Sequence, residues 1–300
     1  MDRINKKLGY IDRKELVIKR ILQLFALISI LTTIGIVITL FKEALVFLQE
    51  VSIVEFLTGK IWAPLLEPRH FGILPLVTGT MLIAVCSSII SLPLGLATAI
   101  YLSEYAPSRA RKIIKPMLEI LAGIPSVVYG YFALTFITPV LQKIYPGTEV
   151  FNAASASIAL GIMILPMVAS LSEDAMMAIP DSIRNGAYAL GSTKFEVATK
   201  IVVPASISGI VSAFVLAVSR AIGETMVVAI AAGASPKLTF NPFESVQTMT
   251  GYMVNVALGD IQHGTIMYKT VFAVGAVLFI ITFIMNIIAK LIVKKVGEAY

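Results

Sequence analysis

Charged residues and cysteine are scarce in this 300-residue sequence. Asp, Glu, Lys and Arg together make up 14% of it, whereas hydrophobic residues make up 57%. With a mean hydropathy of +0.89, the chain is too apolar for a soluble globular domain. The single cysteine, Cys86, excludes an intramolecular disulfide and the cysteine-rich metal sites.

Motifs for catalysis are also missing. The two histidines, His70 and His263, lie outside the long apolar runs, and neither belongs to an H-E-x-x-H motif or a plausible Ser/His pair. There is no G-x4-G-K-[ST] loop to cradle the phosphates of ATP. We therefore expect this chain to have no enzymatic activity, no metal and no cofactor of its own.

Six apolar runs are long enough to cross a membrane, which takes about 20 helical residues. None alternates polar and apolar residues with a period of two, so the sequence predicts an all-α integral membrane protein with six transmembrane helices. The predicted helices cover residues 21–41, 73–103, 117–141, 153–178, 205–233 and 270–293. We expect residues 1–72 to hold the N-terminus, a retained first helix and an external loop, and residues 73–293 to form a compact membrane domain.

Lysine and arginine are distributed unevenly between the two sides of these runs. With the N-terminus in the cytoplasm, seventeen of the 24 lie inside and six outside, while Arg220 falls within a run. Because cytoplasmic segments carry the excess of positive charge, the count predicts a multi-pass plasma (inner) membrane protein with both termini cytoplasmic. The net charge of +6 then reflects topology, and we expect contacts with membrane lipid but none with nucleic acid.

Two charges interrupt the run 205–233. A lone Arg220 or Glu224 at the bilayer centre would cost about 2.5–3.5 kcal/mol. In one continuous helix, residues four apart lie on the same face, so the two side chains can neutralise each other and fix helix packing. Alternatively, the arginine contacts a passing oxyanion, which its fork of donors matches, and Gly223 leaves room for that anion or for a neighbouring helix.

A proline-centred stretch in the run 117–141 is a second candidate site. Small and hydroxyl-bearing residues surround Pro125 between Gly123 and Tyr131. Small residues let helices approach closely, and Ser126 can offer a hydrogen bond to a solute. Plain helix packing is the alternative explanation.

The predicted cytoplasmic loop 180–204 contains signals for two short amphipathic helices. Gly191 favours a helix stop with positive φ, and Thr193 and Glu196 have the spacing of a capping box that starts a second helix. Apolar residues at helical spacing include Ile183, Ala187 and Leu190. The pair is therefore predicted either to dock on a partner protein or to lie on the membrane surface.

The same loop resembles the EAA loop of ABC-importer permeases. Its pattern Ala187-x3-Gly191-x9-Ile201-x-Val203-Pro204 is similar to the family pattern E-A-A-x3-G-x9-I-x-L-P. Asn185 and Gly186 stand where the family has glutamate and the first alanine, and Val203 stands where it has leucine, so the acidic residue of that loop has no counterpart here.

Further motifs resemble the PstC-type permease subunits of phosphate ABC importers. They are PLVTGT at 75–80, LPLG at 92–95, YLSEYAP at 101–107, GIPSVVYG at 123–130 and RAIGETM at 220–226. The sister PstA type shares R-x-x-G-E-T but usually continues with alanine-proline, whereas this chain continues with Met226-Val227. The PstA position, a permease for sulfate, molybdate or phosphonate, and a secondary transporter are the alternatives.

The resemblance implies a five-helix type I permease core preceded by an extra N-terminal helix. It implies four kinds of partner: a second permease subunit (PstA-like), a homodimeric ATPase (PstB-like) that binds ATP and Mg, an external phosphate-binding protein (PstS-like) and membrane lipid. On this basis Arg220, Glu224, Gly223 and Ser126 are the expected translocation residues. Ala187, Gly191, Ile201 and Pro204 are the expected ATPase-coupling residues.

Overall fold

The computed structural model describes residues 2–259, 261–262 and 264–297, and side chains from residue 15 to residue 294 within those ranges. His263 therefore lies outside the described residues. The helices are α1 (Asp2–Glu50), α2 (Ile53–Thr58), α3 (Leu74–Ile100), α4 (Ser108–Gly123), α5 (Ser126–Phe132), α6 (Thr138–Ile144), α7 (Ala153–Met177), α8 (Asp181–Ala189), α9 (Lys194–Val197), α10 (Val203–Ala205), α11 (Ile207–Ile222), α12 (Met226–Ala231), α13 (Met249–Leu258) and α14 (Ile266–Gly297). Three π-helical segments, η1 (Tyr101–Tyr105), η2 (Ala133–Ile137) and η3 (Ala198–Val202), accompany an antiparallel pair of short strands, β1 (Trp62–Ala63) and β2 (His70–Phe71).

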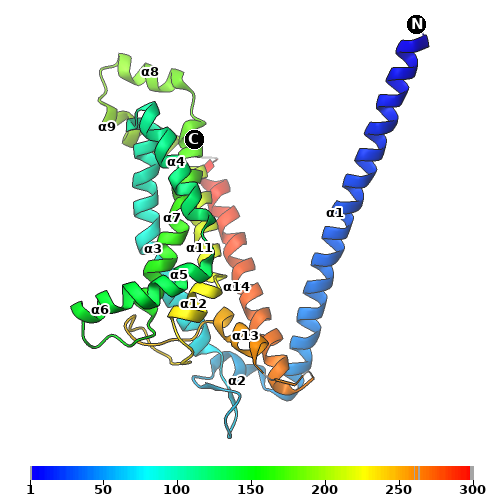
Figure 1. Cartoon of the computed structure of the whole chain (residues 1–300), viewed down its shortest axis with the longest axis vertical. Helices are drawn as coiled ribbons and strands as arrows, with labels where there is room; N and C mark the ends of the chain where they lie inside the picture. The colour runs from blue at the N-terminus through cyan, green and yellow to red at the C-terminus, as the bar shows by residue number, and fades with distance from the viewer. Residues whose placement is uncertain (1, 260, 263, 298–300) are drawn as a thin grey trace.

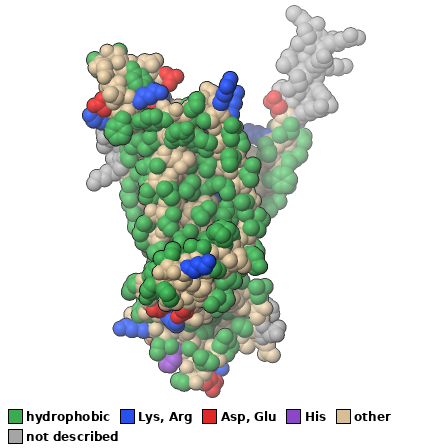
Figure 2. Space-filling view, turned by 60° about the vertical axis from the view of Figure 1, so that its left-hand side comes forward, with side chains coloured by type: hydrophobic (Ala, Val, Ile, Leu, Met, Phe, Trp, Pro, Cys, Tyr) green, Lys and Arg blue, Asp and Glu red, His purple; other side chains and the backbone are tan. Residues whose placement is uncertain are grey.

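Long apolar helices dominate the described part of the chain. Five are long and apolar enough to cross a membrane, and a sixth span results if Lys194–Ala205 and Ile207–Ile222, bent by 71°, are counted as one. Hydrophobic side chains cover the middle of the bundle in the face that Figure 2 shows, and charged side chains gather toward both ends. The predicted all-α integral membrane fold is confirmed.

The first helix stands apart from the bundle (Figure 1). It extends well beyond the predicted run 21–41, and its large apolar side chains are exposed from Leu16 to Ile38. Only its far end is anchored: the ring of Phe41 meets that of Phe279 of α14 at 5.7 Å, and Lys269 pairs with Glu50 at 2.7 Å. The exposed apolar length of α1 can face lipid or another membrane subunit.

The centre of the bundle is the packing of α3 against α7. Gly95 permits this close approach, since an added Cβ would lie 2.6 Å from Val168. Helix α7 matches the predicted run 153–178, and its start is capped by Asn152, whose side-chain oxygen accepts the amide of Ser155 at 2.7 Å. Helix α3 continues through η1 to Tyr105, two residues beyond the predicted run 73–103.

The expectation of a single helix over 117–141 is wrong. Helix α4 ends at Gly123 and a new helix starts at Ser126, because Ile124 is extended (φ −67°, ψ 130°), as is usual before a proline. Pro125 also lacks the amide that would continue the ladder. The hydroxyl of Tyr129 donates to the carbonyl of Leu121 at 2.8 Å and bridges the break.

A single helix over 205–233 is also wrong. Helix α11 begins after Ser206, ends at Ile222, and is followed by the non-helical Gly223–Thr225 segment and the short α12. Helix α14, by contrast, contains the whole of the predicted run 270–293. The break in this run therefore lies just after Arg220 and includes Glu224.

An aromatic cluster closes the bundle at the end opposite α8 (Figure 1). The ring of Phe47 contacts those of Phe56 and Phe71 at 5.3 and 5.5 Å. Trp62 of β1 meets Tyr252 of α13 edge-on at 5.0 Å. This cluster joins the hairpin, α2 and α13 to the base of α1 and α14, within the predicted external loops.

Candidate functional site

Arg220 lies in the last turn of α11, at the wall of a cavity. It stands thirteen residues after Ile207, so it lies roughly 20 Å along the helix axis. The cavity has a volume of about 370 Å³ and is bounded by α4 and α7 as well as α11, with Lys115, Leu118, Pro166, Ser170 and Glu173 in its lining. A charged guanidinium at this depth faces a space large enough for a small anion.

Glu224 does not pair with Arg220. Its carboxylate accepts the backbone amides of Met226 at 3.1 Å and Val227 at 3.3 Å, and so caps the first turn of α12. Because α11 ends at Ile222, the two charges do not share a helix face and the expected neutralising pair is not formed. Among the described residues, no carboxylate lies within ion-pairing distance of Arg220.

Gly223 and Thr250 shape the break between the two helices. A Cβ added at Gly223 would make ordinary van der Waals contacts with the carbonyls of Ser219 and Arg220, at 3.7 and 3.9 Å, and the role of this glycine in leaving room for an anion stays a prediction. The hydroxyl of Thr250 in α13 donates to the backbone carbonyl of Glu224 at 2.6 Å. A carbonyl freed by the end of α11 is thus satisfied from a neighbouring element.

Ser126 is placed differently from the other expected translocation residues. It is the first residue of α5, and that helix packs against α12 rather than against Arg220's cavity. Within the described residues its hydroxyl has no hydrogen-bond partner, so no hydrogen bond joins it to Arg220 or Glu224. A role in translocation for Ser126 stays a prediction.

A buried carboxylate in the cavity wall was missed by sequence reasoning. Glu173 of α7 is fully buried; Arg111 approaches it to 2.6 Å and Lys115 to 3.3 Å, both from α4. These are ionic contacts, since no donor meets either oxygen in hydrogen-bond geometry. The sequence signal for this site is an acidic residue near the end of the apolar run 153–178. A charge inside such a run needs a partner of opposite charge.

The segment from α8 to α10 has the two local signals that the sequence predicts. Gly191 has φ of +84°, a conformation that favours glycine. Thr193 and Glu196 form a capping box: the Thr193 hydroxyl accepts the Glu196 amide at 3.3 Å, and the Glu196 carboxylate accepts the Thr193 amide at 3.1 Å. The two-helix form of this segment is therefore confirmed.

The segment from α8 to α10 buries some of its apolar side chains and exposes others on its surface. Ala187 is 6% exposed and packs with Ala99, Met176 and Ile210, and Ile201 packs partly buried against the same cluster. Three large side chains point outward instead, with 46% of Ile183, 89% of Leu190 and 67% of Phe195 exposed. Ile183 and Ala187 lie one turn apart in α8, as their spacing predicts, but of these residues and Leu190 only Ala187 is buried. Pro204 sits two residues before the bend into α11.

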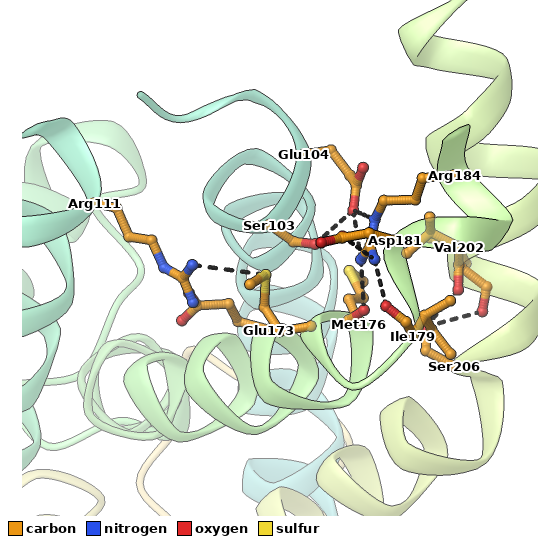
Figure 3. A network of polar contacts seen from close by, with 12 residues as sticks. Ser103, Glu104, Arg111, Glu173, Met176, Ile179, Asp181, Arg184, Val202 and Ser206 are labelled. Atoms are coloured by element: carbon orange, nitrogen blue, oxygen red, sulfur yellow. Dashed lines mark hydrogen bonds and ion pairs between the residues drawn. The ribbon is translucent and has the colours of Figure 1, made fainter. Parts of the chain in front are cut away.

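Arg184 is a second charged residue that the sequence did not single out. It projects from α8 toward the ends of α3 and α7 and meets Glu104, as Figure 3 shows. Its side chain is 11% exposed and that of Glu104 is 4% exposed. The YLSEYAP motif contains Glu104, but its partner lies eighty positions along the chain.

The sequence of this chain matches a known family of transport proteins. The family described as "Binding-protein-dependent transport system inner membrane component" matches residues 91–298, more than half of the chain. The chain belongs to this family. It is a multi-pass membrane permease of the ABC importer type, built as the type I permease core that the sequence predicted.

Curated relatives of this permease include two that cover most of its length. It is 34% identical to the "Probable ABC transporter permease protein YqgH" of Bacillus subtilis, over 88% of this chain and 86% of the relative. It is 31% identical to the "Phosphate transport system permease protein PstC" of Mesorhizobium japonicum, over 80% of this chain and 78% of the relative.

Solved transporters share the fold of this permease. A chain of the bacterial alginate ABC transporter, in complex with an alginate pentasaccharide-bound periplasmic protein, matches with a TM-score of 0.65 at 16% identity and covers 94% of this chain and 97% of its own. The inward-facing MetNI methionine ABC transporter matches with a TM-score of 0.54 at 19% identity, over 75% and 94%.

Proposed function

We propose that this permease carries inorganic phosphate across the plasma membrane as the PstC-type subunit of an ATP-driven importer. Relatives named as phosphate permeases at about 30% identity, together with the phosphate-permease motifs, support this substrate. The observation that carries the proposal is Arg220 at the wall of a cavity, without a carboxylate partner among the described residues.

Arg220 is suited to meet phosphate in transit. A guanidinium keeps its charge when desolvated and offers a planar fork of donors to phosphate oxygens. Glu224 is engaged with the first turn of α12, so an anion need not displace it in this conformation. Glu173 in the same cavity wall balances Lys115 and Arg111, which limits how tightly an anion is retained there.

The outward apolar residues of α8 and α9 are the proposed ATPase contact. Leu190 and Phe195 project where they can enter a groove on a partner. In this arrangement the α8 end and both termini face the cytoplasm, in agreement with the lysine and arginine count. The partners are a PstA-like permease, a homodimeric PstB-like ATPase that binds ATP and Mg, and an external PstS-like phosphate-binding protein.

Uptake by the assembled complex tests the substrate. The complex is reconstituted in liposomes and labelled phosphate import is measured with ATP inside or outside and with excess sulfate, molybdate or phosphonate. The proposal expects ATP-dependent import that only unlabelled phosphate suppresses. Suppression by another oxyanion would reassign the substrate, and import driven by a proton gradient without ATP would make the chain a secondary transporter.

Substitution of Arg220 tests the site. Arg220→Gln should lower phosphate uptake by about tenfold or more, since a charge-assisted contact is lost, while the complex still assembles. Arg109→Gln, which changes an exposed arginine at the start of α4, is the matched control. Normal uptake by the Arg220→Gln complex would refute the role of this arginine.

A further inference from the structure

Arg184 is unusual among the residues of the proposed ATPase-docking segment. It is the only basic residue of α8, and its neighbours on either side in sequence, Ile183 and Asn185, are exposed. Its own side chain is 11% exposed. A long cationic side chain at a surface ordinarily extends its head into water, so this one is held inward by its partners.

Those partners lie at or just beyond the ends of two membrane-spanning helices. The Nε and Nη2 atoms of Arg184 each donate to Oε1 of Glu104 at 3.3 Å. Nη2 also donates to the carbonyl of Met176 at 2.7 Å, and Nη1 donates to the carbonyl of Ile179. Glu104 belongs to η1, which ends the α3 span; Met176 lies in the last turn of α7, and Ile179 lies two residues beyond the end of that helix (Figure 3).

The contacts of Arg184 satisfy buried polar groups that have few other partners, so the junction resists separation. The last carbonyls of a helix lack partners within the helix and carry partial negative charge, which the guanidinium satisfies. Glu104 is 4% exposed and accepts the hydroxyl of Ser103 at 2.7 Å as well. Separating Arg184 from Glu104 would leave a buried charge unpaired, which is strongly unfavourable, so the ion pair holds α8 against the ends of α3 and α7.

The other end of the docking segment is connected differently. Residues Lys194–Ala205 meet α11 (Ile207–Ile222) at an angle of 71°. At this bend the Ser206 hydroxyl donates to the carbonyl of Val202 at 2.7 Å, a contact within the same stretch of chain. Helix α11, which carries Arg220, is joined to the segment through this bend and through Ile210 in the apolar cluster, whereas the ion pair joins the segment to the ends of α3 and α7.

We infer that Arg184 and Glu104 are positioning residues that transmit movement of the docked segment to α3 and α7, while α11 changes its angle at the bend. The inference rests on the proposed function, since it requires an ATPase on the outer side of α8 and α9. The cavity wall includes residues of α7 and Arg220 of α11. Relative movement of these helices changes the cavity that the anion occupies.

The test measures how many anions are imported per ATP hydrolysed. Glu104→Gln removes the charge but keeps the shape, and Arg184→Lys keeps the charge but loses the fork that bridges carboxylate and carbonyls. Each should lower the import-to-ATP ratio by about tenfold, within the range of a coupling between two sites, while ATPase subunits still co-purify. Asp181→Asn is the matched control, because Asp181 also faces Arg184 at 3.4 Å but is 90% exposed.

A distance measurement separates coupling from simple folding. Spin labels at Ser182 of α8 and Ser108 at the start of α4, both exposed, are introduced with Cys86→Ser. Glu104→Gln should broaden the distance distribution in the complex, and Asp181→Asn should not.

Two outcomes would overturn the inference: an unchanged ratio with an unchanged distribution, or loss of assembly in both Glu104→Gln and Arg184→Lys, which would limit the pair to folding. Failure of the proposed substrate is distinguishable from both. The ratio is measured with whichever anion the wild-type complex imports, so a complex that imports sulfate instead of phosphate still tests the pair.

Discussion

Thr250 donates its hydroxyl to the backbone carbonyl of Glu224 at 2.6 Å. One element, α13, thus supports the point where α11 stops and α12 begins. The hydroxyl belongs to a residue that is 6% exposed, so water does not readily replace it. The shape of the break next to Arg220 therefore depends on a helix from a different part of the chain.

Thr250→Val should loosen this break. The substitution keeps the shape of the side chain and removes the hydrogen bond to Glu224, worth about 1 kcal/mol, together with the contact to the Thr248 hydroxyl at 3.2 Å. The effect on phosphate uptake should be about fivefold. Thermal unfolding and uptake of the purified complex measure both effects. Thr282→Val is the control, because that hydroxyl bonds only within α14; equal behaviour of the two variants would contradict a special role for Thr250.

Glu224→Ala and Glu224→Gln should differ. Alanine removes the acceptor for the amides of Met226 and Val227, and loss of a helix cap costs about 1 kcal/mol. Glutamine keeps an oxygen in the same place, so its effect on stability and uptake should be the smaller of the two. If the two variants are impaired equally, the charge of Glu224 matters more than the cap, as in the ion pair that the sequence suggested.

Gly191→Val should weaken retention of the ATPase subunits without affecting membrane insertion. The φ of +84° at Gly191 would cost a β-branched residue about 1–2 kcal/mol, and the turn that orients α8 against α9 would change. Co-purification with the ATPase measures the effect. Gly186→Ala is the control: Gly186 lies within α8 and nothing stands within 4 Å of an added Cβ, and it should behave as wild type.

Glu149 should make the ordering of the loop after α12 depend on pH. The backbone amide of Ser245 and the ammonium of Lys237 hold the pKa of Glu149 below its ordinary value. Because the folded-state pKa is lowered, this contact stabilises the loop above the unfolded pKa of about 4.3 and is lost as the pH falls through the folded value.

Hydrogen exchange of residues 237–248, corrected for intrinsic rates, measures this effect. Protection should be constant near neutral pH and fall below about pH 4. Glu149→Gln should reduce protection at neutral pH and abolish the pH dependence. A wild-type profile in that variant would mean that other contacts hold the loop.

The sequence by itself determined the features that depend on composition or on a few neighbouring residues. Apolar runs give the spans because hydrocarbon excludes charge and demands helical backbone pairing. The turn at Gly191 and the capping box of Thr193 and Glu196 are predictable because each is specified within one turn of chain. The motifs at 123–130 and 220–226 similarly indicated the family.

Only the tertiary structure decided where the charges go. Arg220 and Glu224 are four positions apart, yet α11 ends between them, so Arg220 lines the cavity while Glu224 accepts the first amides of α12. Arg184 pairs with Glu104 eighty positions away, and Glu173 of α7 pairs with Arg111 of α4, with α5, η2 and α6 between the two helices in the chain. A buried charge needs a partner of opposite charge, and helix packing decides which one lies close enough. The spacing of residues along the sequence does not specify that packing.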